Sequence, residues 1–500
     1  MRIGRNLAVG LFNSAWSAVV SLAVVPLYLR YLGIENYGLI GFFVTIQALF
    51  QLLDMGMGPT MNREVARCTA SDSLQEARTL LSTLEIIYWG MAVAILCIVL
   101  LLSPFISQHW LQSKNLSPET ITHVIILMGV VVAARWPVGL YQGALMGAHR
   151  LAISGGINIV MVTIGSLGAV LVLAFLSPTI EAFFIWQVGV GLVYALVMRK
   201  AARRVLGVEK SSSFDWSSLK RVWKFSASMS FIALLGGLFT QMDKLILSKL
   251  LGLVEFGQYM LATLVVSSLY ILVIPVFNVV YPRFTDMVSK GQTTDLISFY
   301  RLSTRILATV LFPVALLLIL NAQELVTIWT GNEELAVSVG PVIALLAAGT
   351  ALHGIMYFPY ALQLAFGETR IPIVISITLM LVLTPLTIYL TISFGSQGAA
   401  MAWLLLHVFY MIIGTWLTHR RLLKGLGLTW LFQDIGTPLV VTAIVGMFGN
   451  FLVLDKAQLL YERVGFGVLL VLTATTLSTV LSSKMRTLVL NKLGLSKNLS

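Results

Sequence analysis

Two basic residues, Arg135 and Lys244, lie inside apolar stretches that are long enough to cross a membrane. A lone arginine at the centre of a bilayer costs at least about 2.5–3.5 kcal/mol, so its side chain must face a water-filled cavity or a partner. Two further cations, Arg30 and Lys249, stand at the ends of apolar stretches, 219 positions apart. Such cations can contact an anion, form a structural ion pair or reach toward the membrane interface. For Arg135, the ion pair could form with Asp54.

A second set of polar residues could line a cavity or carry a coupling ion. Asp243 directly precedes Lys244, and consecutive helical residues point about 100° apart, so we do not expect the two to share one partner. Asp243 either pairs with a neighbouring helix or binds a coupling proton or sodium ion. Hydrogen bonding between helices is the alternative to a cavity for the rest of the set, because polar side chains in lipid must face protein or water. These residues are Gln241, which shares a helical face with Lys244, the stripe Gln47, Gln51 and Asp54, and Asn13.

Four residues near the ends or proline-interrupted parts of apolar stretches are candidates for contact with sugars: Tyr141, Gln142, Tyr357 and Tyr360. Anchoring at the membrane interface is the alternative for tyrosines near span ends. We interpret His353 as a helix-packing residue, with a proton relay as the alternative.

The composition places these residues in a membrane protein. Of 500 residues, 58% are apolar and 11% are charged, and the mean hydropathy is +0.91. Soluble chains carry about 25% charged residues, so a soluble enzyme, a disordered chain and a nucleic-acid binder are excluded. The runs are continuous rather than alternating, which predicts an all-α polytopic fold instead of a barrel. The two cysteines cannot build a metal site or a disulfide framework, and no ATP-binding loop is present, so we expect no cofactor.

The apolar runs predict about fourteen transmembrane helices. If the N-terminus is cytoplasmic, 26 of the 33 lysines and arginines fall on the cytoplasmic side and 5 on the outer side. This bias predicts that both termini lie in the cytoplasm. The predicted spans are 9–31, 37–58, 81–106, 120–146, 151–177, 181–198, 225–250, 256–280, 303–321, 336–364, 371–393, 396–418, 432–454 and 463–482.

The sequence also repeats itself. The segment 32–38 (LGIENYG) matches 251–257 (LGLVEFG) at an offset of 219, and 146–150 (MGAHR) matches 366–370 (FGETR) at 220. Six helices therefore recur as two lobes of the same orientation, related by a pseudo-two-fold along the membrane normal. The predicted domains are an N-lobe (1–198), a basic cytoplasmic linker (199–224), a C-lobe (225–418), two extra helices (432–482) and a basic tail (483–500). The linker serves as an orientation signal, with contact to anionic lipid heads as a secondary role.

Several segments in the first 80 residues carry a resemblance to a known family. They are NSAW at 13–16, PLYLRYLGIENYG at 26–38, LLDMGMG at 52–58, and Asn62-Arg63. With the two-lobe plan of six, six and two helices, the chain resembles the polysaccharide-biosynthesis, Wzx-type flippases of the multidrug/oligosaccharidyl-lipid/polysaccharide exporter superfamily.

This resemblance implies export of an undecaprenyl-diphosphate-linked oligosaccharide to the outer leaflet by alternating access, for O-antigen, capsule or exopolysaccharide. The implied partners are this anionic lipid-linked oligosaccharide and membrane lipids, with a polysaccharide polymerase or a chain-length regulator as further candidates. A diphosphate needs cations facing a wet cavity, and Arg135, Lys244, Arg30 and Lys249 are the candidates for this contact. A drug or metabolite-cation antiporter of the same superfamily is the alternative. We expect no enzymatic activity.

Overall fold

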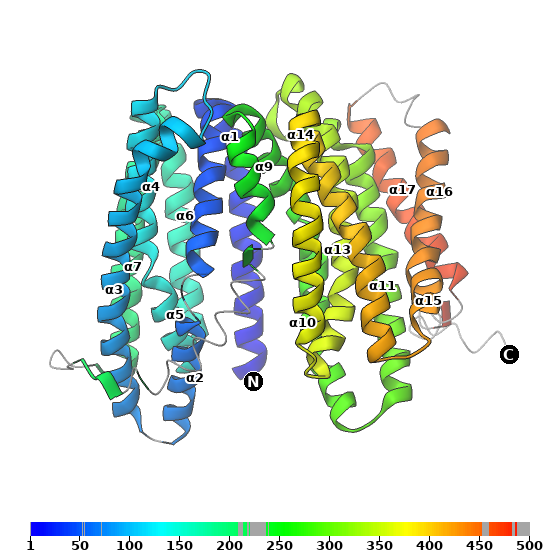
Figure 1. Cartoon of the computed structure of the whole chain (residues 1–500), viewed down its shortest axis with the longest axis horizontal. Coiled ribbons are helices and arrows are strands. Elements are labelled where there is room, and N and C mark those ends of the chain that lie inside the picture. Colours follow the sequence, from blue (N-terminus) through cyan, green and yellow to red (C-terminus); the bar gives the residue numbers. More distant parts are fainter. Residues whose placement is uncertain are drawn as a thin grey trace. The chain divides into compact units, whose positions relative to one another are not determined.

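A computed structural model gives the fold of the chain (Figure 1). It describes residues 2–52, 54, 56–71, 73–208, 214–217, 220, 237–238, 240–452, 460–482 and 486–487, without the side chains of 2–11, 14, 52 and 452. Part of the predicted linker, the first part of the span predicted at 225–250, and nearly all of the basic tail lie outside these residues. The chain divides into a first unit, Met1–Gly257, and a second unit, Gln258–Ser500.

The first unit consists of helices that run nearly parallel to one another (Figure 1). Residues 240–250 are also helical, and α9 crosses from the first unit into the second. The named elements are α1 (Arg2–Leu52), α2 (Met57–Ala70), α3 (Leu74–Phe105), the π-helix η1 (Ile106–Trp110), α4 (Pro118–Arg135), α5 (Val138–Gly147), α6 (Leu151–Phe175), α7 (Ile180–Leu206) and α9 (Leu253–Ser267).

The second unit is also built of helices, with α13 packed against α10, α11, α12 and α14. Its elements are α10 (Tyr270–Ser289), α11 (Thr293–Leu320), α12 (Ala322–Thr330), α13 (Glu333–Ala365), α14 (Arg370–Arg421), α15 (Gly427–Thr429), the π-helix η2 (Trp430–Gly436), α16 (Thr437–Leu452) and α17 (Leu460–Leu481).

Local sequence explains where several helices begin and end. Ser117 and Thr179 cap α4 and α7 by accepting backbone hydrogen bonds from the residue three positions later. Glycines in the left-handed region end α7 at Gly207 and α12 at Gly331. Pro137, two residues after the end of α4, separates it from α5, because proline cannot donate the hydrogen bond that would continue the helix.

The predicted all-α, polytopic membrane fold is confirmed. Within the described part of the chain, eleven helices are long and apolar enough to cross a membrane, and thirteen of the fourteen predicted spans fall on them. Two of these helices hold two predicted spans each. Helix α1 breaks at Gly33, where φ is 76°, and α14 breaks at Gly395, where φ is 58°.

Three predicted boundaries differ from the structure. The span predicted to end at residue 58 ends at Leu52, because Gly56 adopts a left-handed conformation and starts the separate helix α2. The span predicted at 256–280 consists of α9 followed by α10, which continues to Ser289. Helix α7 continues to Leu206, so Arg199 and Arg203 lie on a helix and not in an irregular linker.

Two glycines of the repeated segment touch each other inside the first unit. A Cβ on Gly38 would collide with the carbonyl oxygen of Leu253, and a Cβ on Gly257 would collide with that of Ile34. The offset of 219 that relates Gly38 to Gly257 also relates Ile34 to Leu253. Each segment therefore contacts the other through the same two positions, which is the pattern that a two-fold relation between the segments produces.

Candidate functional site

Arg135 is the last residue of α4 and packs against α7. The Cγ of Arg135 lies 3.4 Å from where a Cβ on Gly191 would be, so the missing side chain at Gly191 leaves the space that the arginine stem fills. One guanidinium nitrogen, Nη2, donates to Gln187 Oε1 at 2.6 Å, and Gln187 Nε2 donates to the backbone oxygen of Gly165 at 3.1 Å. The Nε of Arg135 is buried and has no partner among the residues that the structure describes.

No carboxylate lies within 4 Å of Arg135 in the described part of the chain. The ion pair with Asp54, which the sequence left open, is not formed. Asp54 instead lies in the turn before α2, where one carboxylate oxygen accepts from the backbone N–H of Gly58 at 3.1 Å and the other from the Tyr88 hydroxyl. Asp54 therefore caps α2 and ties it to α3, and Arg135 keeps an uncompensated charge.

A chain of hydrogen bonds crosses the first unit and includes two of the candidate residues. Gln142 of α5 donates to the Tyr194 hydroxyl at 3.1 Å, and Tyr194 donates to Asn158 Oδ1 at 2.8 Å. Asn158 in turn donates to Asn13 Oδ1 at 2.8 Å. Since Tyr194 is close enough to Arg135 for an electrostatic interaction, the guanidinium borders a line of polar groups from four helices.

Asp243 and Lys244 pair with each other. Lys244 Nζ lies 3.3 Å from Asp243 Oδ1 and also donates to the backbone oxygen of Thr240 at 3.1 Å. The angle of about 100° between consecutive helical positions did not suggest this pair. It forms because the lysine stem is long enough to bend back along the helix. The charge of Lys244 is therefore partly compensated, and Gln241 lies half-buried nearby.

The repeat-related cations Arg30 and Lys249 differ in their surroundings. Arg30 is exposed and forms no hydrogen bond or ion pair with the described residues. Lys249 donates to the backbone oxygen of His109 in η1, and its ammonium lies 5.8 Å from the ring centroid of Trp110. Gln47 is half-buried and Gln51 is exposed, and neither side chain forms a hydrogen bond with a residue described here.

Tyr141 is fully buried, at 0% exposure, and belongs to a charged cluster. Its hydroxyl donates to Glu85 at 3.0 Å and accepts from Trp89 at 3.3 Å. Glu85 also accepts from Arg199 and, at 2.7 Å, from Arg203, both on α7. Sequence reasoning missed Glu85, although an acidic residue four positions inside a predicted span was a signal for it. This cluster explains why α7 extends past the membrane span.

Tyr357 and Tyr360 belong to an aromatic cluster of the second unit. Phe277 of α10 stacks on Tyr360 with ring centroids 6.2 Å apart and meets Tyr357 edge-on at 5.4 Å. Tyr270 also contacts Tyr357 at 6.3 Å. All four side chains are half-buried, so the cluster offers ring faces and hydroxyls at the edge of a packed bundle.

A second charged cluster, also missed from the sequence, attaches η2 to α11. Asp434 is fully buried and accepts from Arg301 at 2.7 Å and from Arg305. Trp430 donates to Thr304 at 3.0 Å and stacks on Tyr300 with a centroid distance of 5.6 Å. The arginines were counted as cytoplasmic charges, and nothing in the sequence indicated that a residue more than a hundred positions later binds them.

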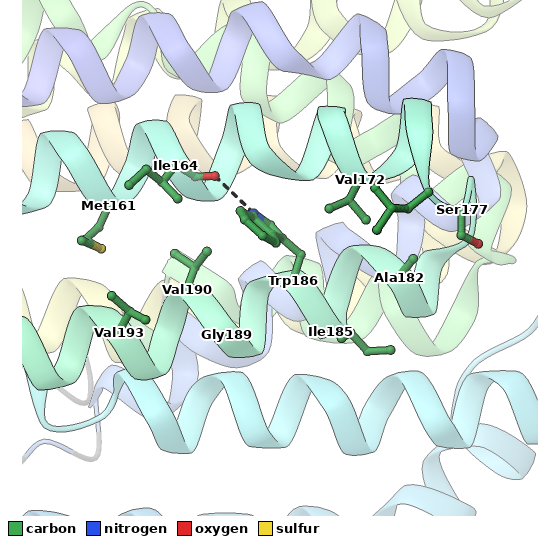
Figure 2. Close-up of a pocket in the computed structure, with 11 residues that line it drawn as sticks. Met161, Ile164, Val172, Ser177, Ala182, Ile185, Trp186, Gly189, Val190 and Val193 are labelled. Carbon is green, nitrogen blue, oxygen red and sulfur yellow. Dashed lines mark hydrogen bonds between the residues drawn. The ribbon is translucent and has the colours of Figure 1, made fainter.

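An apolar pocket of about 540 Å³ lies between α6 and α7 (Figure 2). Trp186 points into it and donates from its indole nitrogen to the backbone oxygen of Ile164 at 3.2 Å. Met161, Val172 and Val193 form part of its wall. None of the candidate site residues lines this pocket, and it offers no charged group for an anionic ligand.

Comparison with known proteins agrees with the membrane fold. The family model for polysaccharide biosynthesis protein matches residues 3–288 of this chain. A protein of Shigella flexneri named as an O-antigen transporter is 20% identical over 428 residues, which cover 84% of this chain and 98% of that protein. The teichuronic acid biosynthesis protein TuaB of Bacillus subtilis is 25% identical over 289 residues, covering 56% of this chain and 57% of TuaB.

Solved structures share the fold at low sequence identity. The lipid II flippase MurJ, in an inward closed conformation, aligns with a TM-score of 0.68 and 14% identity over 93% of this chain and 97% of MurJ. A multidrug resistance MATE family transporter of the MOP superfamily, in an inward-facing conformation, aligns with a TM-score of 0.67 and 14% identity over 81% of this chain and 94% of that transporter. The family resemblance inferred from the sequence is thus confirmed: the chain is a multi-pass membrane protein that belongs to the polysaccharide biosynthesis protein family, a family of transporters and not of enzymes.

Proposed function

We propose that this chain moves an undecaprenyl-diphosphate-linked oligosaccharide from the cytoplasmic to the outer leaflet of the bacterial inner membrane, by alternating access. The observation that carries the proposal is the guanidinium of Arg135, which lies half-buried in a membrane span and, among the described residues, bonds to a neutral amide but to no carboxylate. A diphosphate carries about two negative charges and cannot cross hydrocarbon without such a cation. The guanidinium remains charged at any physiological pH and can bind two phosphate oxygens at once.

The other three candidate cations, Lys244, Arg30 and Lys249, contact the diphosphate at different stages in this proposal. Lys244 supports the diphosphate from the same unit, and its bond to Asp243 would exchange for a phosphate contact. Arg30 and Lys249 would receive the diphosphate at the outer ends of their helices. The polar chain through Gln142, Tyr194 and Asn13 lies beside Arg135 and offers partners for hydroxyl groups.

A protein site that binds sugars needs aromatic ring faces as well as hydrogen-bonding groups. The cluster of Tyr357, Tyr360 and Phe277 presents both at the half-buried edge of the second unit. Tyr141 is the weaker sugar candidate, because its side chain is fully buried and its hydroxyl already binds Glu85. A polysaccharide polymerase or chain-length regulator is the partner that would act on the exported lipid.

The alternative, export of an organic cation, needs acidic groups that are free to receive it. Asp54 already accepts hydrogen bonds from Tyr88 and Gly58, and Asp243 pairs with Lys244. Glu85 is neutralised by two arginines. The intramembrane charge that remains uncompensated is therefore positive, which favours an anionic substrate.

The test replaces Arg135 by methionine, which keeps the length of the stem and removes the charge. We expect Arg135→Met to abolish outer-leaflet glycan in cells that depend on this chain. Arg135→Lys should retain part of the glycan, because the positive charge stays but the planar guanidinium that can bind two phosphate oxygens is lost. Lys290→Met is the matched control, since Lys290 is an exposed cation paired with Asp286 in the turn between α10 and α11.

The amount of each variant in the membrane fraction is measured in the same cells. Normal surface glycan in Arg135→Met at wild-type protein levels would refute the anion site. Gained resistance to cationic dyes on overexpression of the wild-type chain would favour the antiporter instead.

A further inference from the structure

Two histidines of the second unit face each other where α13 packs against the second half of α14. The imidazole centroids of His353 and His407 lie 4.7 Å apart, with the ring planes inclined by 52°. The helices approach closely because Gly349, about one turn before His353, has no side chain, and a Cβ there would lie 2.7 Å from Trp403 Cδ1. The contact between the two rings is therefore built into the packing of this helix pair.

The hydrogen bonds of His407 leave one nitrogen available. Its Nδ1 lies 2.8 Å from the backbone oxygen of Trp403, and because a carbonyl can only accept, Nδ1 carries a hydrogen. In a neutral imidazole the other nitrogen, Nε2, then holds a lone pair. His407 is fully buried, and its Nε2 has no partner among the residues of the described ranges. A buried acceptor without a donor is uncommon in proteins and calls for an explanation.

His353 connects this buried nitrogen to the edge of the bundle. Its Nδ1 lies 2.6 Å from the Tyr270 hydroxyl of α10, and its side chain is half-buried instead of buried. The Tyr270–His353–His407 arrangement therefore leads inward from a half-buried hydroxyl to the free lone pair. A proton could follow this line, because each group can both accept and donate one.

The groups that face the pair are neutral. They are Tyr270 of α10, Tyr357 of α13 and Tyr410 of α14, with Tyr360 beyond Tyr357. Residues 306–320 of α11, which packs on α13, contain no titratable side chain. The acid of α12, Glu324, is bound to Arg463 at 2.6 Å. An added proton would thus be the main charge of this region and would be held by the two imidazoles themselves.

We propose that His353 and His407 bind one proton between them, accepted on His407 Nε2. Binding converts a neutral pair into a single positive charge, and no bond changes other than the N–H bond that forms. Resting on the proposed function, this site would couple the outward movement of the anionic lipid to the inward movement of a proton. Ionisable residues inside membrane spans are typical of such relays.

In the predicted repeat, the spans that carry this pair correspond to the spans that form the Arg135 contact of the first unit. His353 follows Arg135 by 218 positions, and His407 follows Gln187 by 220. The same pair of packed spans therefore carries an arginine and an amide in one unit and two histidines in the other. The first unit holds a permanent charge at this position, whereas the second unit holds a charge that can be gained and lost.

Trp403 offers a reporter for the proton, because its ring centroid lies 4.3 Å from that of His407. A protonated imidazole quenches indole emission. The purified full-length protein in detergent is titrated from about pH 8 to about pH 5, and the signal of Trp403 is isolated as the difference from the same protein carrying Trp403→Phe. We expect the Trp403 emission to fall reversibly toward acid.

Two variants test the assignment. His407→Asn keeps an N–H donor for the carbonyl of Trp403 but has nothing in place of Nε2, so we expect it to abolish the response. His353→Gln removes the second imidazole, so the midpoint should move to lower pH. His419→Asn is the matched control: His419 lies on the same helix with Nδ1 2.8 Å from the Thr415 oxygen, but its Nε2 is already bonded to Tyr300, so the response should persist.

A wild-type Trp403 emission that does not change over this range, or that changes equally in His407→Asn, would overturn the proton site. The titration contains no substrate, so its result is independent of the proposed function. Unchanged glycan export by His407→Asn, at wild-type protein levels, would overturn the coupling while leaving the flippase proposal in place. An intact proton response in a chain that cells do not need for surface glycan would instead refute the proposed function alone.

Discussion

At the scale of single residues, the acids buried in the membrane spans are neutralised and Arg135 is not. Glu85 binds two arginines and a tyrosine hydroxyl, and Asp434 binds Arg301 and Arg305. These clusters follow the usual rule that a buried charge is paired and hydrogen-bonded. Arg135 departs from the rule, and this departure is what makes it a candidate for a ligand rather than a packing residue.

Asp434 allows a direct measurement of what such a pairing contributes. Asp434→Asn removes a fully buried negative charge and leaves two guanidinium groups that are only 23% and 15% exposed without their counter-ion. We expect a loss of about 3–5 kcal/mol in the free energy of unfolding, because the two half-buried guanidinium charges lose their buried counter-ion. Unfolding of the purified protein in a denaturing-detergent titration measures this loss.

The control for Asp434 is Asp286→Asn. Asp286 pairs with Lys290 at 2.8 Å, but both side chains are 58% exposed, so the loss should be at most about 0.5 kcal/mol. Equal effects of the two substitutions would contradict the view that the Asp434 cluster holds η2 against α11.

At the scale of elements, the sequence predicted the helices well and their attachments poorly. Lipid requires every backbone group of a span to be bonded within the helix, so continuous apolar runs identify the spans directly. The partners of charged residues depend on tertiary packing instead. Glu85 and Arg199 are 114 positions apart, and Arg301 and Asp434 are 133 apart. For the same reason His353 could be interpreted as a helix-packing residue, whereas its contact with His407 could not be predicted.

The crossing of α1 with the start of α9 offers a test at this scale. Gly38→Ala would place a methyl group against the backbone oxygen of Leu253, which cannot rotate away as a side chain could. We expect a loss of about 1–3 kcal/mol in the free energy of unfolding, as for overpacking of a tight contact. Gly257→Ala should have a similar effect, because its methyl group would meet the backbone oxygen of Ile34.

Gly90→Ala is the matched control for these glycines. Gly90 lies inside α3, and a Cβ there would meet nothing within 4 Å. Alanine is the better helix former by about 1 kcal/mol, so this substitution should leave stability unchanged or raise it. If Gly38→Ala behaved like Gly90→Ala, the close approach of the two repeated segments would be refuted.

At the scale of the whole molecule, the predicted repeat relates spans of the two units that carry different charged and titratable side chains. The reciprocal contacts of Gly38 and Gly257 are those of two equivalent segments, while the corresponding spans further along carry an arginine with an amide in one unit and two histidines in the other. A duplicated scaffold keeps its packing glycines, because each meets backbone directly. Side chains that do not meet backbone in this way are freer to diverge, so a fixed charge and a titratable one can occur on corresponding spans.

The orientation predicted from the charges can be tested on the whole molecule. With 26 lysines and arginines on one side and 5 on the other, the positive-inside rule puts the turn at Lys290 in the cytoplasm and the loop at Lys114 outside. Single cysteines, Lys114→Cys and Lys290→Cys, are placed in a chain whose own cysteines are changed to alanine. Both positions are exposed, so a thiol reagent that cannot cross the membrane should reach either one from its own side.

In intact cells we expect the reagent to label Lys114→Cys and to leave Lys290→Cys unlabelled until the membrane is permeabilised. Labelling in the opposite order would contradict the predicted orientation, and the anionic lipid would then enter the chain from the side of Lys114. An inside-negative potential drives an anion outward with about 2.3 kcal/mol per charge at 100 mV, whichever way the chain is oriented, so it assists the proposed export of an anionic lipid.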